Sequence, residues 1–480
     1  VTSEAIWLQV ASRLADPRLG VGYPAVGRRV VIDYSAPNVA KEMHVGHLCT
    51  TIIGDSLARL LDFCGAEVIR QNHLGDWGTQ FGMLIQFIDE HPEAEWHQDQ
   101  LASGESAVSA LDTLYRAARK QFETDPEFAH RSRARVVALQ AGEPATIAAW
   151  REIVAESEKA FRAIYDRLGV QLTPDDNAGE STYNPHLADV VAELTDAGIA
   201  VESDGALCVF TDGLTGPDGT PIPLIIRKRD GGYGYATTDL ATIRHRVRNL
   251  KADQILYVVD ARQALHFRMI FHTARRAGWL PDSIDVRHVA FGTVLGPDGK
   301  PFKTRTGGTV RLSDLLNAAV NQARTVVADN RDLPGEELDT IAEQAGIAAV
   351  KYADLATSRT KDYTFDVNRM VSFTGDTGVY LQYAHTRIAS ILRKATDAKP
   401  TVDTTVPLHP AERTLVLHLD SYTATLTETT DLLEPHRLCS YLSTLARTFT
   451  AFYETCPVLS ADTSEMRGNR LALVDLTART

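Results

Sequence analysis

The chain has 480 residues, too many for one ordinary domain, so two or three domains are expected. Hydrophobic residues make up 44% and charged residues 23%, as in a soluble globular protein, and no apolar run approaches the ~20 residues of a membrane span. The formal net charge of −13 argues against a nucleic-acid partner unless Lys and Arg gather on one face.

The cysteines and the N-terminus give the expected compartment. No segment at the N-terminus has the pattern of a signal peptide. The five cysteines have no metal-ligand spacing: Cys49, Cys64, Cys208, Cys439 and Cys456. We therefore expect a reduced, cytoplasmic protein without a structural metal site and without membrane contact.

The first part of the chain has the pattern of an α/β nucleotide-binding sheet. A short helix is expected from Ser3 to Leu14, and a buried strand from Arg29 to Tyr34. A helix from His47 to Phe63 follows, with Gly65 as its C-cap, and the next strand runs from Glu67 to Gln71. This strand–turn–helix–strand order begins a parallel sheet.

Helices then interrupt the α/β pattern. Residues 90–168 are polar with helical periodicity, broken near Gly142, and predict a helical insertion. Further strands are expected at 201–211, 221–228, 254–260 and 286–294, with a helix at 264–278 and a Gly-rich loop at 296–308. From Leu312 onward the pattern is almost wholly helical, which predicts an all-α C-terminal domain.

The segment from Asp33 to His47 carries the strongest chemical signal. His44 and His47 stand three residues apart at a helix start and point the same way. The helix N-terminus also offers free N–H groups suited to phosphate. Gly46 permits close approach of a nucleotide, and Lys41 supplies a cation just upstream. The alternative is that the two histidines only cap the helix.

This segment resembles the HIGH signature of class I aminoacyl-tRNA synthetases, and its context resembles the arginyl-tRNA synthetases of bacteria. The similarity runs from about Leu19 to the last residue. Besides residues 35–47, it is carried by four stretches: 72–82, 179–181, 232–239 and 260–267.

The second signature of class I enzymes, the KMSKS loop, has its counterpart at 300–308. Here Lys303 is followed by Thr304 and Arg305, and the second lysine of the signature is absent. In the family, a lysine upstream of the HIGH element is thought to compensate, and in this chain that residue is Lys41. A glycine-flanked basic loop suits closure over a triphosphate. The alternative is an exposed basic hairpin.

The resemblance also implies the substrate contacts. The arginine site is expected to comprise Asp33, Asn38, Tyr235, Asp239 and Gln263, and carboxylates suit a guanidinium group. Asp239 is favoured as the main guanidinium partner, with Asp33 or Tyr235 beside it. The alternatives are a turn cap for Asp33 and the N-cap of a helix from Leu240 for Asp239.

The ATP site is expected to comprise Gly46, His44, His47, His266, Thr304 and Arg305. Of these, His44 and His47 are also assigned catalytic roles together with Lys41 and Lys303. Gln263 and His266 match a Gln-x-x-His element that contacts the ribose and the amino acid. A His on an amphipathic helix is otherwise more often packed than ligating.

The C-terminal helices are expected to bind tRNA. Tyr380, Tyr383 and Arg387 fall on one helical face, which suits unpaired bases of an anticodon loop. The alternative is a tyrosine stripe that packs in the core.

We therefore expect a Rossmann-type catalytic domain with an insertion and an all-α anticodon-binding domain. The divisions are 1–25 for an N-terminal helix and loop, 26–365 for the catalytic domain with its insertion at about 90–230, and 366–480 for the anticodon-binding domain. The expected activity joins L-arginine to tRNA(Arg) with ATP and Mg²⁺, in a monomer. A secondary-metabolism paralogue and a non-catalytic tRNA-binding module remain as alternatives.

The chain departs from the family pattern at three places. It begins about where the extra N-terminal domain of bacterial enzymes would end, and it stops short of the usual C-terminal segment. Cys49 stands where an arginine is common, so it either tunes activity near the ATP site or is simply a buried neutral side chain.

Overall fold

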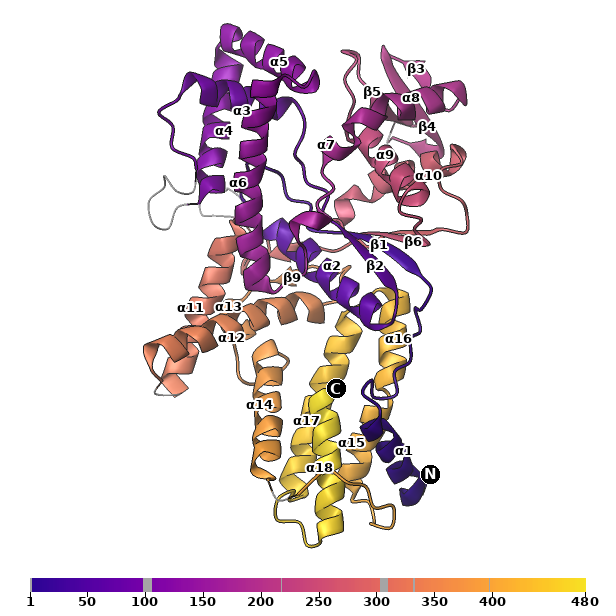
Figure 1. Ribbon diagram of the computed structural model, residues 1–480, viewed down its shortest axis with the longest axis vertical. Helices are drawn as coiled ribbons and strands as arrows, with labels where there is room; N and C mark the ends of the chain where they lie inside the picture. The colour runs from indigo at the N-terminus through magenta and orange to yellow at the C-terminus, as the bar shows by residue number, and fades with distance from the viewer. Residues whose placement is uncertain (1, 98–105, 217, 303–309, 331–332, 397) are drawn as a thin grey trace.

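A four-stranded parallel sheet in the order β2-β1-β6-β7 lies at the centre of the computed structural model (Figure 1). Its strands are β1 (Arg29–Asp33), β2 (Glu67–Gln71), β6 (Gln254–Tyr257) and β7 (Asp285–His288). Val30 and Ile32 face one hydrophobic core and Val31 faces another, so β1 is covered on both sides. The structure describes residues 2–97, 106–216, 218–302, 310–330, 333–396 and 398–480.

Helix α2 (Val45–Phe63) connects β1 to β2, so the expected strand–helix–strand unit is confirmed. The helix begins at Val45, two residues earlier than expected, because His44 serves as its N-cap. The helix ends at Phe63, and its C-cap is Cys64 rather than the expected Gly65. Gly65 follows with a φ of 94°, a left-handed conformation that favours glycine. This unit places the start of α2 at the carboxyl edge of the sheet, where ligands bind in such folds.

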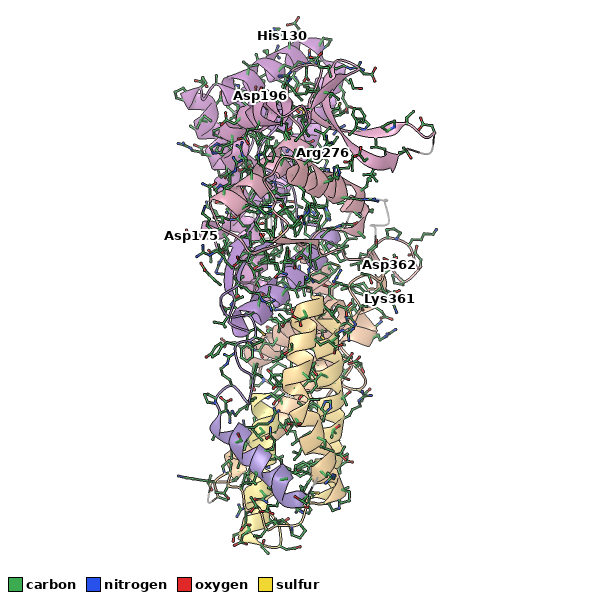
Figure 2. All side chains as sticks on the ribbon, turned by 90° about the vertical axis from the view of Figure 1, so that its right-hand side faces the viewer. His130, Asp175, Asp196, Arg276, Lys361 and Asp362 are labelled. Atoms are coloured by element: carbon green, nitrogen blue, oxygen red, sulfur yellow. The ribbon has the colours of Figure 1, made fainter. Side chains whose placement is uncertain are left out.

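The expected helical insertion is present as a bundle of long helices above the sheet (Figure 1). Its helices are α3 (Thr79–Glu90), α4 (Ala107–Thr124), α5 (Pro126–Gln140) and α6 (Pro144–Leu168). Proline at the first position and a carboxylate N-cap start both α5 and α6. The break expected near Gly142, with φ 75°, separates these two helices. In the side view His130 marks the outer end of the bundle (Figure 2).

A second arm rises beside the insertion and frames the carboxyl edge of the sheet (Figure 1). It contains α7 (Glu180–Tyr183), α8 (Leu187–Asp196), α9 (Tyr235–Arg248), α10 (Ala264–Arg276) and the antiparallel strands β3 (Val201–Ser203), β4 (Ala206–Thr215) and β5 (Pro221–Arg227). Short 3₁₀ turns lie at Pro174–Asp176, Asn184–His186 and Ala261–Gln263. The strand expected at 201–211 is in fact two, β3 and β4, joined by a tight turn at Asp204 and Gly205.

The strand expected at 286–294 is also divided. Strand β7 ends at His288, and the chain then leaves the sheet so that Phe291 pairs with Asp260. The apolar run continues into β8 (Val294–Leu295), which pairs with β9 (Tyr363–Thr364) from much later in the chain. Apolar residues occur on both sides of this division, at Val286 and at Val294, so the sequence pattern does not reveal it.

Apart from β9, the regular structure from Leu312 onward is helical in the described residues, as expected. It comprises α11 (Leu312–Asn330), α12 (Gly335–Ala356), α13 (Val367–Met370), α14 (Gly378–Lys394), α15 (Pro410–Asp420), α16 (Tyr422–Leu432), α17 (His436–Thr455) and α18 (Ser464–Arg479). Helix α1 (Ser3–Ala15) packs against α15 and α18, so the two ends of the described chain share a core. Trp7 is fully buried there and donates a hydrogen bond to the carbonyl oxygen of Val406.

None of the described helices combines the length and the apolar character needed to cross a bilayer.

Candidate active site

A strained turn after β1 shapes the edge of the sheet. Ser35 and Ala36 have φ values of 72° and 47°, a left-handed conformation that is costly for residues with a Cβ. Two side chains hold the turn: the backbone N–H of Ser35 donates to Thr50 Oγ1 at 3.0 Å and that of Ala36 to Asn72 Oδ1 at 3.0 Å. The exposed Asn38 follows directly and pairs through its backbone with Gly75. The turn therefore fixes the position of Asn38 just beyond the end of β1.

His44 and His47 form a reciprocal cap at the start of α2. The Nδ1 atom of His44 accepts from the N–H of Gly46 at 3.0 Å, and Nδ1 of His47 accepts from the N–H of His44 at 3.0 Å. The ring centroids are 4.0 Å apart. A Cβ at position 46 would lie 2.8 Å from Cε1 of His44, so this cap needs Gly46. The capping role considered as the alternative function is real, and it positions both rings.

Both imidazoles are neutral at physiological pH. Burial, with a smaller effect of His44, lowers the pKa of His47 to about 3. Burial, and then the charge of Arg262, lowers the pKa of His44. Since Nδ1 of each ring accepts a hydrogen bond, the proton of each neutral ring is on Nε2. Two N–H donors are therefore fixed at a helix N-terminus, an arrangement suited to phosphate oxygens.

The chain segment after the expected KMSKS counterpart lies beside these histidines. The N–H of Val45 donates to the carbonyl oxygen of Val310 at 3.2 Å, and the N–H of Leu312 donates to that of Met43 at 2.8 Å. Arg311 and His44 thus form an isolated β-bridge. Lys303, Thr304 and Arg305 lie outside the described residues. The segment that directly follows the expected KMSKS counterpart therefore pairs with the start of α2.

Lys41 lies between the sheet and the insertion. Its Nζ is 4.8 Å from the centre of the Tyr115 ring on α4. The preceding N–H of Ala40 donates to Ser157 Oγ on α6 at 3.0 Å, which ties this loop to the insertion. Lys41 is half-buried and precedes His44 by three residues in the chain.

Asp239 and His266 contact each other directly. His266 Nε2 and Asp239 Oδ2 are 2.5 Å apart, and both side chains are partly accessible. The alternative that Asp239 caps a helix from Leu240 is wrong, because α9 already begins at Tyr235. Tyr235 is 74% exposed at that helix start, and Gln263 is exposed in the turn before α10. A residue expected to bind arginine and one expected to bind ATP are therefore neighbours.

Glu180, which was not among the expected site residues, forms a group of carboxylates with Asp76 and Asp239. Burial, followed by the charges of Asp76 and Asp239, raises the pKa of Glu180 to about 8. Burial and then Glu180 raise the pKa of the Tyr235 phenol. Asp76 is itself buried and accepts hydrogen bonds from the N–H and the hydroxyl of Ser181 at 2.9 and 2.6 Å. The clustered acids disfavour one another's charge and favour binding of a cation.

Asp33 has a protein partner. Its Oδ2 lies 2.7 Å from Nη2 of Arg246, and the two side chains are 7% and 0% exposed. Burial disfavours the charge of Arg246, but the Asp33 carboxylate more than compensates and raises the pKa of this guanidinium. The ring of Tyr257 lies against the same group at 4.9 Å. Asp33, expected as a contact for the substrate guanidinium, thus already binds a guanidinium of the chain itself.

Cys49 is buried in α2 near Asp354. Burial, then the Asp354 carboxylate, raises the pKa of its thiol well above the ordinary value. Burial also raises the pKa of Asp354 to about 6. The structure agrees with the second expectation for Cys49, a neutral side chain packed inside a helix.

The expected tRNA-binding face of α14 borders a cavity. Tyr383, Arg387 and Tyr453 of α17 line a space of about 630 Å³. Arg387 Nη2 donates to the Tyr383 hydroxyl at 3.1 Å, and its Cζ lies 5.1 and 5.6 Å from the two ring centres. Tyr383 is 42% exposed and Tyr380 is half-buried, so Tyr383 is not part of a packed core stripe.

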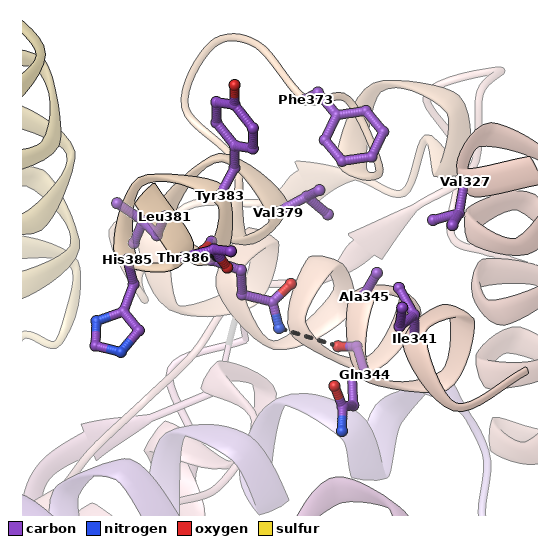
Figure 3. A pocket seen from close by; sticks show the side chains of 11 residues that line it. Val327, Ile341, Gln344, Ala345, Phe373, Val379, Leu381, Tyr383, His385 and Thr386 are labelled. Carbon is purple, nitrogen blue, oxygen red and sulfur yellow. Dashed lines mark hydrogen bonds between the residues drawn. The ribbon is translucent and has the colours of Figure 1, made fainter. Parts of the chain in front are cut away.

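A second cavity, of about 600 Å³, lies on another side of Tyr383 (Figure 3). Residues of α11, α12 and α14 line it, and it is mostly apolar, with Val327, Ile341 and Phe373 among its lining residues. Gln382 Nε2 donates across it to the carbonyl oxygen of Gln344 at 3.3 Å. Tyr383 therefore forms part of the wall of both cavities.

Two family models match the chain. The catalytic domain of class I tRNA synthetases (R) matches residues 9–367, and the DALR anticodon binding domain matches residues 381–480.

Curated relatives are similar over nearly the whole chain. The arginine–tRNA ligase of Frankia casuarinae is 70% identical over 99% of this chain and 81% of its own length. That of Streptomyces avermitilis is 52% identical over 100% of this chain and 82% of its own length.

Solved structures of arginyl-tRNA synthetases have a similar fold. The arginyl-tRNA synthetase of Plasmodium falciparum matches with a TM-score of 0.80 at 29% identity, over 100% of this chain and 80% of that one. The enzyme of Thermus thermophilus also gives a TM-score of 0.80 over 100% of this chain and 83% of its own; at 24% identity this match supports the fold alone.

Proposed function

The chain belongs to the arginyl-tRNA synthetase family, and from that membership we propose that it activates L-arginine with ATP and transfers it to tRNA(Arg). The products are arginyl-tRNA, AMP and pyrophosphate. The single observation that carries the proposal is the contact between Asp239 and His266. Through this contact, a carboxylate suited to a guanidinium group lies at the same sheet edge as the paired histidines suited to phosphate.

The first step needs charge stabilisation rather than a general base. The carboxylate of arginine attacks the α-phosphorus, and the bond to the pyrophosphate leaving group breaks. The Nε2–H groups of His44 and His47 are positioned to donate to the phosphate oxygens as negative charge moves onto them. Lys41 adds a positive charge from the insertion side, and we assign Lys303, Thr304 and Arg305 to the same task. In the second step a terminal hydroxyl of the tRNA attacks the adenylate carbonyl.

Selectivity for arginine follows from the carboxylates of Asp239 and Glu180. We propose that Asp239 and Glu180 bind the guanidinium, with Tyr235 beside them and with Gln263 and Asn38 toward the backbone of the amino acid. Two carboxylates match the planar fork of donors on a guanidinium, and a lysine ammonium would leave part of the site unsatisfied. Asp33 takes a structural role here, because its charge is already matched by Arg246.

A magnesium ion is proposed to accompany the nucleotide. Among the described residues, no three His, Cys, Asp or Glu side chains are grouped to hold a metal ion. Such an ion would therefore be held chiefly by the phosphates, which is the usual mode for Mg²⁺. It would supply further neutralisation of the triphosphate.

We propose that residues 366–480 bind the anticodon loop and that residues 26–365 perform catalysis. The cavity between α14 and α17 offers two aromatic rings with a guanidinium between them. This combination suits stacking of an unpaired base. Tyr380 is assigned to the same face. A monomeric state and a cytoplasmic location stay predictions.

Arginine-dependent exchange of pyrophosphate into ATP, measured with and without tRNA(Arg), tests the proposal. Exchange that requires tRNA and occurs with arginine but not with lysine supports the synthetase. Exchange without tRNA would favour a paralogue with another acceptor. Absence of exchange under both conditions would refute adenylate formation.

A further inference from the structure

Helix α6 runs from the helical insertion down to the central sheet, where it meets the loop between β1 and α2 (Figure 1). This loop carries Asn38 and Lys41, two residues of the proposed site. Its residues Ser35, Ala36 and Ala40 have φ values of 72°, 47° and 61°, a left-handed conformation that is strained in residues with a Cβ. Such a loop keeps its shape only where the surrounding structure holds it.

A buried side chain of α6 holds the first two of these strained residues. Tyr165 is 4% exposed, and its hydroxyl shares a hydrogen bond with Ser35 Oγ at 2.7 Å and accepts another from Asn72 Nδ2 at 3.2 Å. Thr51 Oγ1 donates to the same oxygen of Ser35 at 3.0 Å. Asn72 in turn accepts from the N–H of Ala36 through its Oδ1 at 3.0 Å. One hydroxyl therefore connects the insertion to both residues of the turn.

A second side chain of α6 holds the far end of the loop. Ser157 is fully buried about two helical turns before Tyr165, and its Oγ accepts from the N–H of Ala40 at 3.0 Å. The same hydroxyl donates to the carbonyl oxygen of Ile153 at 2.8 Å, which fixes its direction. Ala40 directly precedes Lys41 in the chain. Helix α6 thus contacts the loop at both of its strained ends.

The lower end of α6 is itself fixed to α12. Lys351 of α12 donates to the carbonyl oxygen of Leu168, the last residue of α6, at 2.6 Å. Arg167 of α6 pairs with Glu343 of α12 at 2.9 Å. Because another helix holds this end, Tyr165 contacts the loop from a fixed support.

We propose that Tyr165 and Ser157 are positioning residues for adenylate formation: by holding the strained loop, they place Asn38 beside the amino acid and Lys41 beside the phosphates. The inference rests on the proposed function. Neither residue needs to touch a substrate, because a displacement of about 1 Å in a catalytic group can cost about 100-fold in rate. Burial raises the pKa of the Tyr165 phenol to about 12, so its hydroxyl stays protonated and serves as both donor and acceptor.

Removal of single hydroxyl groups tests the assignment. Tyr165→Phe and Ser157→Ala should each lower the kcat of arginine-dependent pyrophosphate exchange, measured with tRNA(Arg) present, by about tenfold. The KM for arginine should stay within about threefold, because Asp239 and Glu180 lie on other elements and still bind the guanidinium.

Relief of the strain should restore part of the lost rate. Glycine adopts the left-handed conformation of Ala36 without cost, so the loop would depend less on α6. The Tyr165→Phe/Ala36→Gly double variant should therefore have a kcat about threefold or more above that of Tyr165→Phe.

Two other buried hydroxyl groups provide matched controls. Tyr34 is fully buried at the start of the loop, but its hydroxyl donates to Asp55 Oδ1 of α2 at 3.4 Å and not to the loop. Ser132 is buried in α5, and its Oγ has no hydrogen-bond partner in the described part of the chain. Tyr34→Phe and Ser132→Ala should keep kcat within about twofold of the unmodified chain.

Hydrogen exchange followed by mass spectrometry measures the loop without reference to catalysis. The N–H groups of Ser35, Ala36 and Ala40 donate to side chains of other elements. Peptides that contain these N–H groups should exchange about tenfold faster in the two α6 variants and at the normal rate in the two control variants.

Three results would overturn the assignment: loop exchange that is unchanged in the α6 variants, a kcat that falls no further than in the controls, or no recovery of rate in the double variant. If the unmodified chain exchanges no pyrophosphate, the proposed function fails and the catalytic role of the loop fails with it. Loop exchange would then still decide whether α6 holds the loop.

Discussion

Arg246 Nη2 lies 2.7 Å from Asp33 Oδ2, and this ion pair joins α9 to the end of β1 beneath the candidate arginine site. Both side chains are nearly inaccessible, at 0% and 7% exposure. Helix α9 also carries Tyr235 and Asp239. The pair therefore fixes the helix that presents the guanidinium partner relative to the sheet edge that presents the histidines.

Arg246→Met should destabilise the fold strongly, because it leaves the Asp33 carboxylate buried without a cation. The expected loss is about 3–5 kcal/mol of unfolding free energy, measured by urea denaturation. Arg248→Met is the control, since Arg248 is 52% exposed and its pair with Glu193 should contribute less than about 1 kcal/mol. An Arg246→Met variant as stable as the Arg248→Met variant would show that the pair does not hold α9.

Arginine affinity should rise with pH through the pKa of Glu180, which burial and the neighbouring carboxylates raise to about 8. Below that pH the free site carries a proton that a bound guanidinium must expel. The dissociation constant of arginine should therefore increase about tenfold as the pH falls from about 9 to about 7.

Calorimetry in buffers of different ionisation enthalpy would measure the released proton directly. Glu180→Gln should abolish both the release and this part of the pH dependence. A dissociation constant that is flat over this range, without proton release, would contradict the role of Glu180.

The two tasks of His44 can be separated by substitution. Asparagine also accepts a hydrogen bond at an N-cap, so His44→Asn should keep the stability of α2 to within about 0.5 kcal/mol, whereas His44→Ala should cost about 1 kcal/mol. Both variants lose the Nε2–H donor and should lower the rate of adenylate formation by about 100-fold. Full activity of the stable His44→Asn variant would limit His44 to capping.

Arg387→Ala and Tyr453→Ala should weaken tRNA recognition without affecting the amino-acid site. Loss of one stacked base predicts an increase in the KM for tRNA of about 5- to 100-fold, while the KM for arginine stays within about twofold. Arg447→Ala, on the same helix as Tyr453 but outside the cavity, should be neutral. Equal effects of all three substitutions would argue against a specific base site.

Local signals in the sequence predicted much of the fold. The unit from β1 to β2 and the break at Gly142 follow from periodicity, caps and glycine positions that neighbouring residues determine. The division of the run at 286–294 depends on β9, about 70 residues later in the chain, and periodicity carries no information about that pairing.

Local signals in the sequence also predicted the parts of the site whose residues are close together in the chain. The motif around His44 and His47 was recognisable because its residues are adjacent in the chain. The partner of Asp33 lies 213 residues away, so no spacing could indicate Arg246. Glu180 begins a four-residue helix that has no periodic signal, although it stood in one of the stretches that resemble the family. Only the packing of Asp76 and Asp239 around it reveals an unusual carboxylate.

The most direct test of the central claim, that Asp239 and Glu180 bind a guanidinium, compares arginine with citrulline, its uncharged isostere, by calorimetry. The unmodified chain should bind arginine at least about 100-fold more tightly, because a charged and forked donor set is lost in citrulline. The Asp239→Asn/Glu180→Gln double variant should lose most of this preference. A double variant that still prefers arginine to the same extent would contradict the assignment.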